Sequence, residues 1–376
     1  MDTTATSTPH RGATKTQVWD LPLRVFHWLL VIAVSAAGVT GFLAPEWWLD
    51  VHAYAGYAIG LLLAFRIAWG FVGSHFSRFA TFPLSATNLV KHLKGLPKKT
   101  PQTDPGHNPA GAWMIVVLLT ALVCLEISGL VTLGGQENLG PLASSVSFQT
   151  GHLVEEFHEI LAWGLLIAIG GHLGGILVET FVLDHPVVKA MITGRRNREL
   201  TQSINTHWKR GLMVFSTTSA FLILGGLALA NLPSSAIPKL SFPASYKTEC
   251  GDCHDAYHPS LRTAETWKTM IDGLSNHYGE DASLDDETMT SIGTFLTTSS
   301  ANKFDTEAAH RVGRKETPSM RMTDTKFWKK KHRKIAEPIF KQKTVGSKIN
   351  CMACHGDALS GRFDDQNIQI PPGDIM

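Results

Sequence analysis

Five long apolar stretches follow one another along the chain, the last of them ending at Leu232, and none occurs after that point. Each has about 20 residues, which is enough to cross roughly 30 Å of hydrocarbon at about 1.5 Å per residue. The stretches are Val25–Leu43, Ala53–Phe71, Gly111–Leu133, Ile160–Leu183 and Met213–Leu232. The pattern therefore predicts five transmembrane helices. The first could be mistaken for a cleaved signal peptide, but four further spans follow it.

The charges of the connecting segments indicate how the chain crosses the membrane. Basic residues precede the first span and fill the second and fourth connections, whereas Ala44–His52 and Gly134–His152 contain no Lys or Arg. Because basic loops stay in the cytoplasm, we expect a cytoplasmic N-terminus and residues 240–376 on the far side. The basic residues are Arg11, Lys15, Arg24, Arg78, Lys91, Lys94, Lys98, Lys99, Lys189, Arg195, Arg196, Arg198, Lys209 and Arg210.

Four histidines lie inside the predicted spans or at their ends, where an ionisable side chain is costly and usually functional. His158 and His172 are separated by about four helical turns, so they project from one helix face about 21 Å apart. By depth they pair with His52 near the outer face and with His27 near the inner face. Paired imidazoles across a bundle are typical axial ligands of haem iron. The alternative, hydrogen bonds between helices, suits one such histidine better than four that pair by depth.

Two further ionisable residues lie inside the spans. Arg66 follows His52 by the same interval that separates His158 from His172, so it lies level with the inner histidine pair, where a buried cation suits a haem propionate. Glu126 could relay protons, but it also stands near the outer end of its span, and we favour an interpretation in which it reaches the outer interface.

Several motifs in the first half resemble the bacterial cytochrome b561 family, which includes the di-haem membrane subunits of nickel-iron hydrogenases and formate dehydrogenase. The motifs are Val18–Trp28, His52–Tyr57, Arg66–Gly70, His107–Gly111, His158-Glu159 with His172, and Met191–Gly194. The resemblance covers about residues 17–197 and implies two b haems in a four-helix bundle that exchanges electrons with quinone. The fifth span departs from this pattern and resembles a tether.

Two copies of Cys-x-x-Cys-His follow the last span, at Cys250-Gly-Asp-Cys253-His254 and Cys351-Met-Ala-Cys354-His355. Two thiols at this spacing can each form a thioether to a haem vinyl group, and the adjacent histidine becomes the proximal iron ligand. A zinc site or a disulfide is the alternative, but a histidine follows directly in both copies. We therefore predict two covalent c haems, with Cys250, Cys253, Cys351 and Cys354 as attachment points and His254 and His355 as ligands.

Each c haem also needs a distal ligand, and the residues alone leave His258, His277, His310 and His332 as candidates, with four methionines behind them. Residues 245–371 resemble the di-haem cytochrome c family, some of whose members deliver electrons to an oxygen-binding haem protein. The resemblance rests on both Cys motifs, Trp267, His277-Tyr278-Gly279, Trp328–His332 and Gly361-Arg362-Phe363. It implies bis-histidine ligation by His277 and His332. Their order along the chain suggests that His254 and His277 bind one haem and that His355 and His332 bind the other.

The predicted fold is therefore all-α. It comprises a cytoplasmic tail (1–16), a cytochrome b561-like four-span domain (17–210), a fifth transmembrane helix (211–232), a linker (233–247) and a mainly helical periplasmic di-haem cytochrome c domain (248–376). Six cations within Lys326–Lys334 indicate a solvated helix face, or else a docking site for an acidic partner or cover for haem propionates.

Composition excludes several functional classes. With 34 Lys and Arg against 32 Asp and Glu, the net charge of +2 does not fit a nucleic-acid-binding polycation. The sequence contains no hydrolytic triad, Walker loop or dinucleotide fingerprint, so the chemistry belongs to the cofactors. We predict a multi-pass protein of the bacterial inner membrane that oxidises quinol and passes electrons through b and c haems to a periplasmic acceptor. Reverse flow to quinone, and a haem-based redox sensor or accessory subunit, are the alternatives.

The quinone is expected to react near the inner b haem. The first resemblance places the turn Asn108–Gly111 there, and a helix N-terminus offers backbone N–H groups to a quinone carbonyl. His75 follows the second span on the same side and could exchange the quinol proton. An interfacial histidine bonded to lipid is an equally good interpretation of His75.

Overall fold

The computed structural model describes residues 15–96, 106–197, 207–232, 240–314 and 320–372. Residues 1–14 of the predicted tail and 233–239 of the predicted linker lie outside this part of the chain, as do four predicted loop cations, Arg11, Lys98, Lys99 and Arg198. The chain forms two compact units. The first unit spans residues 1–38, 54–127 and 158–225, and the second spans 39–53, 128–157 and 226–376.

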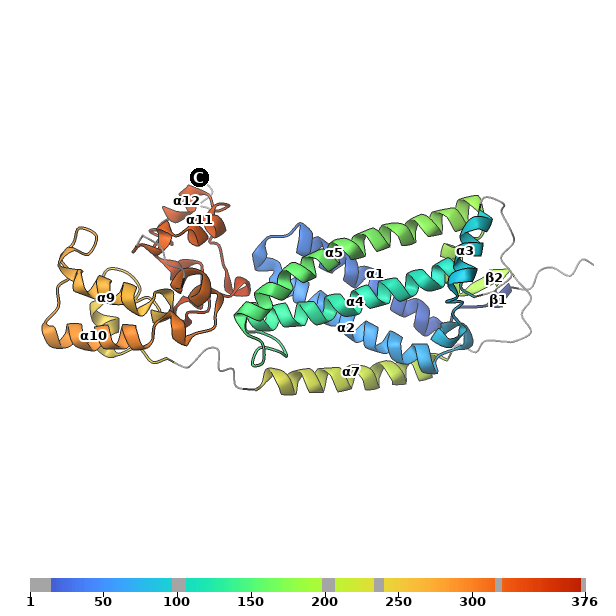
Figure 1. Ribbon diagram of the computed structural model, residues 1–376, viewed down its shortest axis with the longest axis horizontal. Coiled ribbons are helices and arrows are strands. Elements are labelled where there is room, and N and C mark those ends of the chain that lie inside the picture. Colours follow the sequence, from blue (N-terminus) through green and yellow to red (C-terminus); the bar gives the residue numbers. More distant parts are fainter. Residues whose placement is uncertain (1–14, 97–105, 198–206, 233–239, 315–319, 373–376) are drawn as a thin grey trace, which may run out of the picture. The chain divides into compact units, whose positions relative to one another are not determined.

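In the part of the chain that the structure describes, five helices are long and apolar enough to cross a membrane, which confirms the predicted multi-pass architecture (Figure 1). They are α1 (Leu21–Phe42), α2 (Leu49–Val72), α4 (Pro109–Gln136), α5 (Phe148–Leu177) and α7 (Trp208–Ala230). The side chains of Ile167 and Phe221 are each 77% exposed within this single chain. Such faces suit contact with lipid.

Helix α5 begins at Phe148, three turns before the apolar stretch that predicted it. These added turns carry Glu155, Glu156 and Glu159, which favour a helix but not hydrocarbon. A hydropathy pattern detects only the segment inside the lipid, whereas the helix continues beyond it. Because α5 is continuous, His158 and His172 do lie on one helix, as predicted from their spacing.

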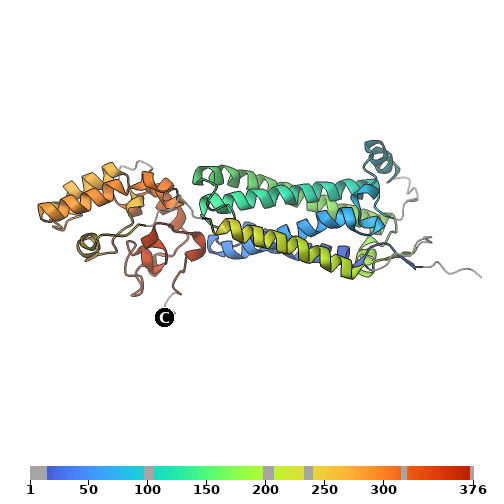
Figure 2. The ribbon, with the colours of Figure 1, turned by 90° about the horizontal axis from the view of Figure 1, so that it is seen from below.

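The core of the first unit is formed by apolar side chains from four helices, among them Phe26, Leu63, Leu122 and Leu165. Helix α7 also packs closely on this unit. The Phe215 ring centre is 6.0 Å from that of Phe65 on α2, so α7 is packed against the bundle as well as leading out of it (Figure 2).

A buried acid joins the beginning of α1 to the end of α2. The carboxylate of Asp20 accepts hydrogen bonds from the Leu23 backbone N–H at 2.8 Å, the Trp69 indole N–H at 3.2 Å and the Ser77 hydroxyl at 2.6 Å. The Ser74 hydroxyl is a further donor. A fully buried carboxylate needs such donors to offset its lost hydration.

Shorter elements complete the first unit. They are strand β1 (Lys15–Gln17), helix α3 (Ala86–Gly95), helix α6 (Val187–Thr193) and strand β2 (Arg195–Asn197). The two strands pair antiparallel, with Thr16 opposite Arg196. This short ladder is the one departure from an all-helical fold within the described residues.

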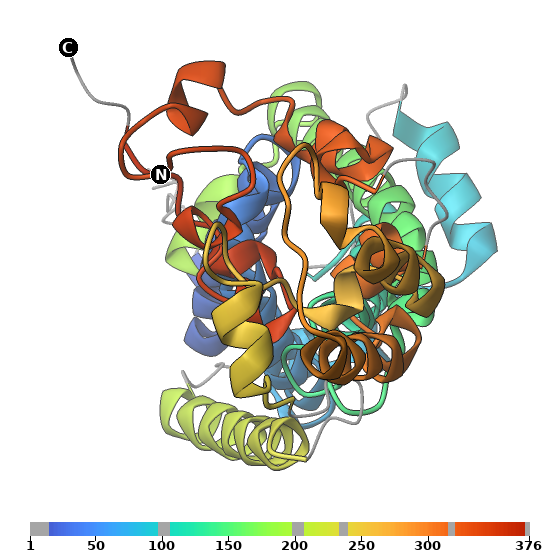
Figure 3. The same cartoon turned by 90° about the vertical axis from the view of Figure 1, so that its left-hand side faces the viewer.

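Among the described residues after the last predicted span, the second unit contains five α-helices, which are joined by single-turn 3₁₀ helices and one π turn, Ala309–Gly313. They are α8 (Ala244–Glu249), α9 (Ala264–Asp272), α10 (Asp286–Thr298), α11 (Lys326–His332) and α12 (Glu337–Phe340). Helices α9 and α10 lie side by side (Figures 1 and 3). Tyr246, Trp267, Ile292 and Leu296 fill the core between them and α8.

Candidate functional site

The first Cys-x-x-Cys-His motif begins where α8 ends, because Cys250 donates its N–H to the carbonyl of Tyr246 at 3.1 Å. The ring of His254 lies beside the ring of His277, with centres 6.3 Å apart and planes inclined by 33°. Two imidazoles that bind one iron from opposite sides at about 2 Å have ring centres about 6 Å apart. This pair therefore fits an iron between the two rings.

The second motif forms a 3₁₀ turn, Cys351–Ala353, which brings the following His355 opposite the last residue of α11. That residue is His332, and the two ring centres are 6.1 Å apart. The spacing again matches two axial ligands of one iron. The structure thus brings together the pairs that chain order suggested.

Hydrogen bonds at the other ring nitrogen hold two of these imidazoles in place. The Nδ1 of His254 lies 2.8 Å from the carbonyl of Asp255, and the Nδ1 of His332 lies 2.9 Å from the carbonyl of Trp328. A carbonyl can only accept, so each Nδ1 carries the proton and each Nε2 offers a lone pair to a metal.

Burial also favours the neutral imidazole that iron binds. It lowers the pKa of His355 to about 4, with a smaller contribution from the neighbouring His332. It lowers the pKa of His332 and of His277 as well. None of the five cysteines, all of which lie in the described part of the chain, forms a disulfide, so the four motif thiols are available for thioether attachment.

The other two candidate histidines have different surroundings. His258 is only 2% exposed, hydrogen-bonds the Ser260 hydroxyl at 2.8 Å and packs edge-on to Phe304. His310 lies 2.6 Å from a carboxylate oxygen of Asp305. Among the described contacts neither ring lies beside a Cys-x-x-Cys-His histidine.

The burial of His258 predicts a specific loss of stability in acid. Its pKa is lowered to about 4, from about 6.5 in the unfolded chain. Between these values only the unfolded chain binds the proton, so stability is fully present above pH 6.5 and falls as the pH drops toward 4, by about 3 kcal/mol in all. Chemical unfolding of the full chain, followed at the c-haem absorption, should show this slope, and His258→Gln should flatten it. An unchanged slope in His258→Gln would contradict the assignment.

His27 and His172 come together within the first unit. They lie on α1 and α5, and their imidazoles interact electrostatically. The Nδ1 of His27 is buried and has no hydrogen-bond partner among the described residues. Such an orphaned nitrogen suits a pocket that also holds a ligand.

The histidines predicted for the outer haem lie on α2 and α5. His52 is held in place, because its Nδ1 lies 3.2 Å from the Thr40 hydroxyl. The ring also lies over Gly41, where an added Cβ would come within 3.1 Å of it. His158 is half-buried on α5, and its role as a ligand stays a prediction.

Arg66 contacts protein groups instead of standing free at the predicted haem level. It is 2% exposed, donates to the Ser77 carbonyl at 3.2 Å and lies 4.6 Å from the centre of the Phe79 ring. It also interacts with Asp20. These contacts give Arg66 a role in closing this end of the bundle, and the propionate contact stays a prediction.

Glu126 does not extend toward the outer interface, so that interpretation is wrong. Its carboxylate packs against α2, where an added Cβ on Gly60 would lie 2.6 Å from its Oε1. Tyr57 is its electrostatic neighbour. The absence of a side chain at Gly60 allows this close approach, which the spacing along α4 alone does not reveal.

Two of the three residues predicted for quinone lie together. Asn108 directly precedes α4 and accepts the N–H of Gly111 through its Oδ1 at 2.6 Å. The Gly111 N–H is therefore already paired, contrary to the expectation of free N–H groups there. His75 is exposed and stands edge-on to Phe76, and no described contact joins it to Asn108.

Two candidate functional residues, Glu179 and His185, were not predicted from the sequence. The Asn108 amide donates to Glu179 Oε1 at 2.5 Å, and His185 Nδ1 lies 2.8 Å from Glu179 Oε2. A signal was present, because Glu179 is an ionisable residue inside the predicted span Ile160–Leu183.

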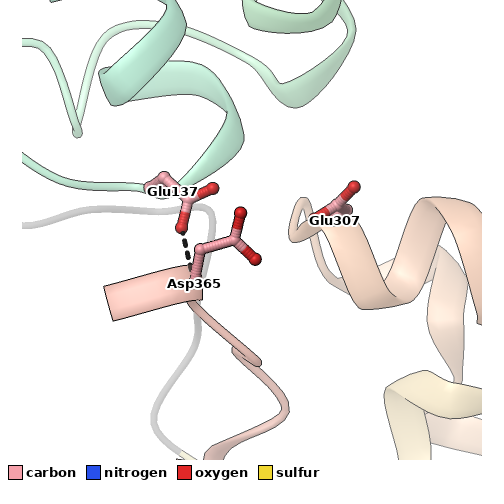
Figure 4. Close-up of side chains that lie close together, drawn as sticks. All are labelled: Glu137, Glu307 and Asp365. Carbon is pink, nitrogen blue, oxygen red and sulfur yellow. Dashed lines mark hydrogen bonds between the residues drawn. The ribbon is translucent and has the colours of Figure 1, made fainter. Parts of the chain in front are cut away.

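An acidic cluster in the second unit joins Glu137, Glu307 and Asp365, whose ligand-capable atoms all lie within 4.8 Å of one another (Figure 4). The Asp365 N–H donates to Glu137 at 3.0 Å. Burial raises the pKa of Asp365 to about 6 and that of Glu137 well above its ordinary value. Lys331 Nζ lies 4.0 Å from a carboxylate oxygen of Asp365. At least one cation of the Lys326–Lys334 run therefore forms an ion pair within the chain.

Comparison with known proteins divides the chain into a membrane half and a C-terminal half. Residues 18–194 match the family described as prokaryotic cytochrome b561, and residues 246–363 match the family described as dihaem cytochrome c. Proteins of the first family bind b haems, and the second kind of domain binds two c haems.

Curated relatives match the membrane half. A probable Ni/Fe-hydrogenase B-type cytochrome subunit of Azotobacter vinelandii is 25% identical over 216 residues, which is 50% of this chain and 90% of the relative. A probable Ni/Fe-hydrogenase 1 B-type cytochrome subunit of Escherichia coli K12 is 23% identical over 220 residues, 50% of this chain and 93% of the relative.

Solved structures match the C-terminal half. The dihaem cytochrome c of Shewanella baltica is 31% identical, covers 35% of this chain and 97% of its own, and has a TM-score of 0.29. The dihaem cytochrome c of Rhodobacter sphaeroides is 30% identical, covers 33% of this chain and 99% of its own, and also has a TM-score of 0.29.

Proposed function

Because the chain belongs to the prokaryotic cytochrome b561 family through residues 18–194 and to the dihaem cytochrome c family through residues 246–363, we propose that it oxidises membrane quinol and passes the electrons to a periplasmic acceptor. The chain is a multi-pass membrane protein, and its role is transmembrane electron transfer. What we propose is the identity of the electron donor and of the electron acceptor, and the direction in which the electrons flow. A small haem protein is a suitable acceptor.

The observation that carries the proposal is the pair of facing imidazole couples in the C-terminal domain, at 6.3 Å and 6.1 Å. Haem supplies reversible one-electron chemistry when it is bound. His254 with His277, and His332 with His355, would each hold one haem iron, and an iron held by two imidazoles would carry electrons and not bind a substrate. Such sites suit electron transfer and not catalysis at the metal.

The membrane half supports entry of electrons from quinol. His27 and His172 would hold the inner b haem, and His52 and His158 the outer one, so that two redox sites would lie at different depths. Quinol gives up two electrons and two protons, while each haem takes one electron. The two histidine pairs would therefore hold two one-electron carriers, one near each face of the membrane.

The basic connecting segments support an orientation with the N-terminus in the cytoplasm and the C-terminal domain in the periplasm. Covalent haem attachment outside the cytoplasm agrees with this orientation. The inner histidine pair would then lie near the cytoplasmic face, beside Asn108 and Gly111, the residues proposed for the quinone site. His75 remains a candidate for proton exchange on the same side.

Reverse flow is the second candidate, and one observation favours it. The curated relatives of the membrane half are named as cytochrome subunits of hydrogenases. In that direction a periplasmic donor would reduce the c haems, and the b haems would reduce quinone. The midpoint potentials of the b and c haems separate the two directions, because electrons flow toward the higher potential.

Anaerobic addition of a quinol to the oxidised, purified protein tests the proposal. We expect the b band to appear first and the c band to follow, with both haem types reduced by an excess of quinol. Dithionite in a parallel sample gives the fully reduced spectrum as the control. Quinol that leaves both haem types oxidised, while quinone rapidly oxidises the dithionite-reduced protein, would support reverse flow instead.

A further inference from the structure

A chain of hydrogen bonds at the end of α5 runs from the residues proposed for quinone binding toward solvent. The Asn108 amide donates to Glu179 Oε1 at 2.5 Å, and Glu179 Oε2 lies 2.8 Å from Nδ1 of His185. All three residues belong to the first unit. The side chain of Glu179 is 12% exposed and that of His185 is 30% exposed, so the chain leads from a buried acid to an accessible imidazole.

The local backbone produces this arrangement. After Leu177 the helix widens into a single π turn, Val178–Val182, a feature that often marks functional positions. The His185 N–H then donates to the Glu179 carbonyl at 2.8 Å. Pro186 follows and starts the next helix, so the chain folds back and places the imidazole beside the carboxylate.

Glu179 also lies close to the proposed inner haem ligand along the chain. It follows His172 by about two helical turns, or roughly 10 Å. Two turns return to the same face of a helix, and Glu179 is only the second residue of the π turn, so its side chain lies on about the same face as that of His172. A quinol that reacts beside His172 and Asn108 would therefore meet this carboxylate.

We propose that Glu179 accepts the protons of the bound quinol and that His185 passes them to the aqueous phase. This inference rests on the proposed oxidation of quinol at the inner site. Each quinol hydroxyl loses its proton to a Glu179 oxygen as one electron leaves for the inner b haem. With Glu179 protonated and His185 in its Nε2–H tautomer, the carboxyl proton moves to the unprotonated Nδ1 and Nε2 releases its proton to water. Proton exchange of the ring with water then restores the Nε2–H tautomer. Two such cycles yield one quinone, two electrons and two protons, so the step balances.

The geometry suits proton transfer as well as hydrogen bonding. Glu179 Oε1 accepts from the Asn108 amide, Glu179 Oε2 lies within hydrogen-bond distance of His185 Nδ1, and each oxygen keeps a further lone pair for a quinol hydroxyl. An imidazole takes a proton at one nitrogen and releases another from the opposite nitrogen. If Glu179 served only to orient Asn108, a glutamine could replace it, because the glutamine oxygen also accepts a hydrogen bond. Glutamine cannot accept the quinol proton, so replacing Glu179 by glutamine tests the proton route.

The experiment compares Glu179→Gln, Glu179→Asp and His185→Gln with the wild-type protein. His92→Gln is the matched control, because His92 is a partly exposed histidine on α3 with no described contact to this chain of hydrogen bonds. Stopped-flow absorption follows b-haem reduction by quinol over a range of quinol concentrations. Dithionite reduction and the b-haem spectrum report whether the haem sites remain intact.

We expect Glu179→Gln to slow the maximal rate of quinol-driven b-haem reduction about 100-fold, with the half-saturating quinol concentration and the dithionite reaction nearly unchanged. His185→Gln should slow it about 10-fold, and Glu179→Asp should restore a large part of the wild-type rate. His92→Gln should behave as wild type.

The outcomes separate this inference from the proposed function. If quinol reduces the wild-type b haems and Glu179→Gln reacts at the same rate, the proton route is overturned while quinol oxidation stands. If Glu179→Gln changes only the half-saturating concentration, Glu179 is a positioning residue and the route is also overturned. If quinol fails to reduce the wild-type protein, the proposed function and the inference fail together.

Discussion

Changing Cys250 and Cys253 together to alanine is expected to halve the covalently bound haem, from two groups per chain to one. The same result is expected for the double change at Cys351 and Cys354. Each motif leads to its own facing histidine couple, so each should retain its haem when the other is removed. The measurement is the haem that stays with the protein after extraction with acidified solvent, together with the mass of the intact chain.

Cys124 supplies the matched control for these changes. It is an exposed cysteine on α4, outside both motifs. Cys124→Ala should therefore keep both covalent haems. Retention of two covalent haems in either double variant would contradict the attachment sites, whereas loss of both haems in one variant would show that the two haem sites depend on each other.

Replacing His52 or His158 by alanine is expected to remove the outer b haem while both c haems stay attached. Loss of one axial imidazole leaves the iron without its second protein ligand, and b haem has no covalent bond to retain it. The Thr40 hydroxyl orients the His52 ring, so Thr40→Val should loosen the outer haem and not remove it. The readout is extractable haem per chain, with the b-haem absorption of the membrane-bound protein.

His152 is the matched control for the outer haem. It lies on α5, less than two turns before His158, but its ring is paired with Glu155 at 3.1 Å and with Arg311 at 2.9 Å. His152→Ala should therefore keep both b haems. A full complement of extractable haem in His52→Ala would refute the outer ligand assignment.

Much of the architecture can be predicted from patterns of residues that are close together in the sequence. Long apolar runs specify the transmembrane helices, because hydrocarbon accepts few other sequences. The Cys-x-x-Cys-His motif is short and carries its own chemistry, so Cys250–His254 and Cys351–His355 could be identified without a fold. The interval from His158 to His172 indicated two sites on one helix, since a continuous helix fixes both distance and face.

The residues alone left four histidines as candidates for the distal ligands, and the resemblance to the di-haem cytochrome c family selected His277 and His332. His277 follows His254 along the chain, whereas His332 precedes His355, so a fixed order relative to the motif does not identify them. His258 is nearer to the first motif than His277 is, yet it packs into the apolar core beside Phe304. Only the packing of the 3₁₀ turns and α11 decides which imidazole faces which.

The sequence by itself determined the five membrane spans, the two covalent attachment motifs and the set of histidines in and beside the spans, because each depends on residues close together in the chain. The tertiary structure alone decided that Arg66 meets Asp20, that Glu126 packs on Gly60, and that Asn108, Glu179 and His185 form one hydrogen-bonded chain. Asn108 and Glu179 are 71 residues apart. Whether two such side chains meet depends on how their helices are rotated and offset against each other, which packing across the whole bundle sets.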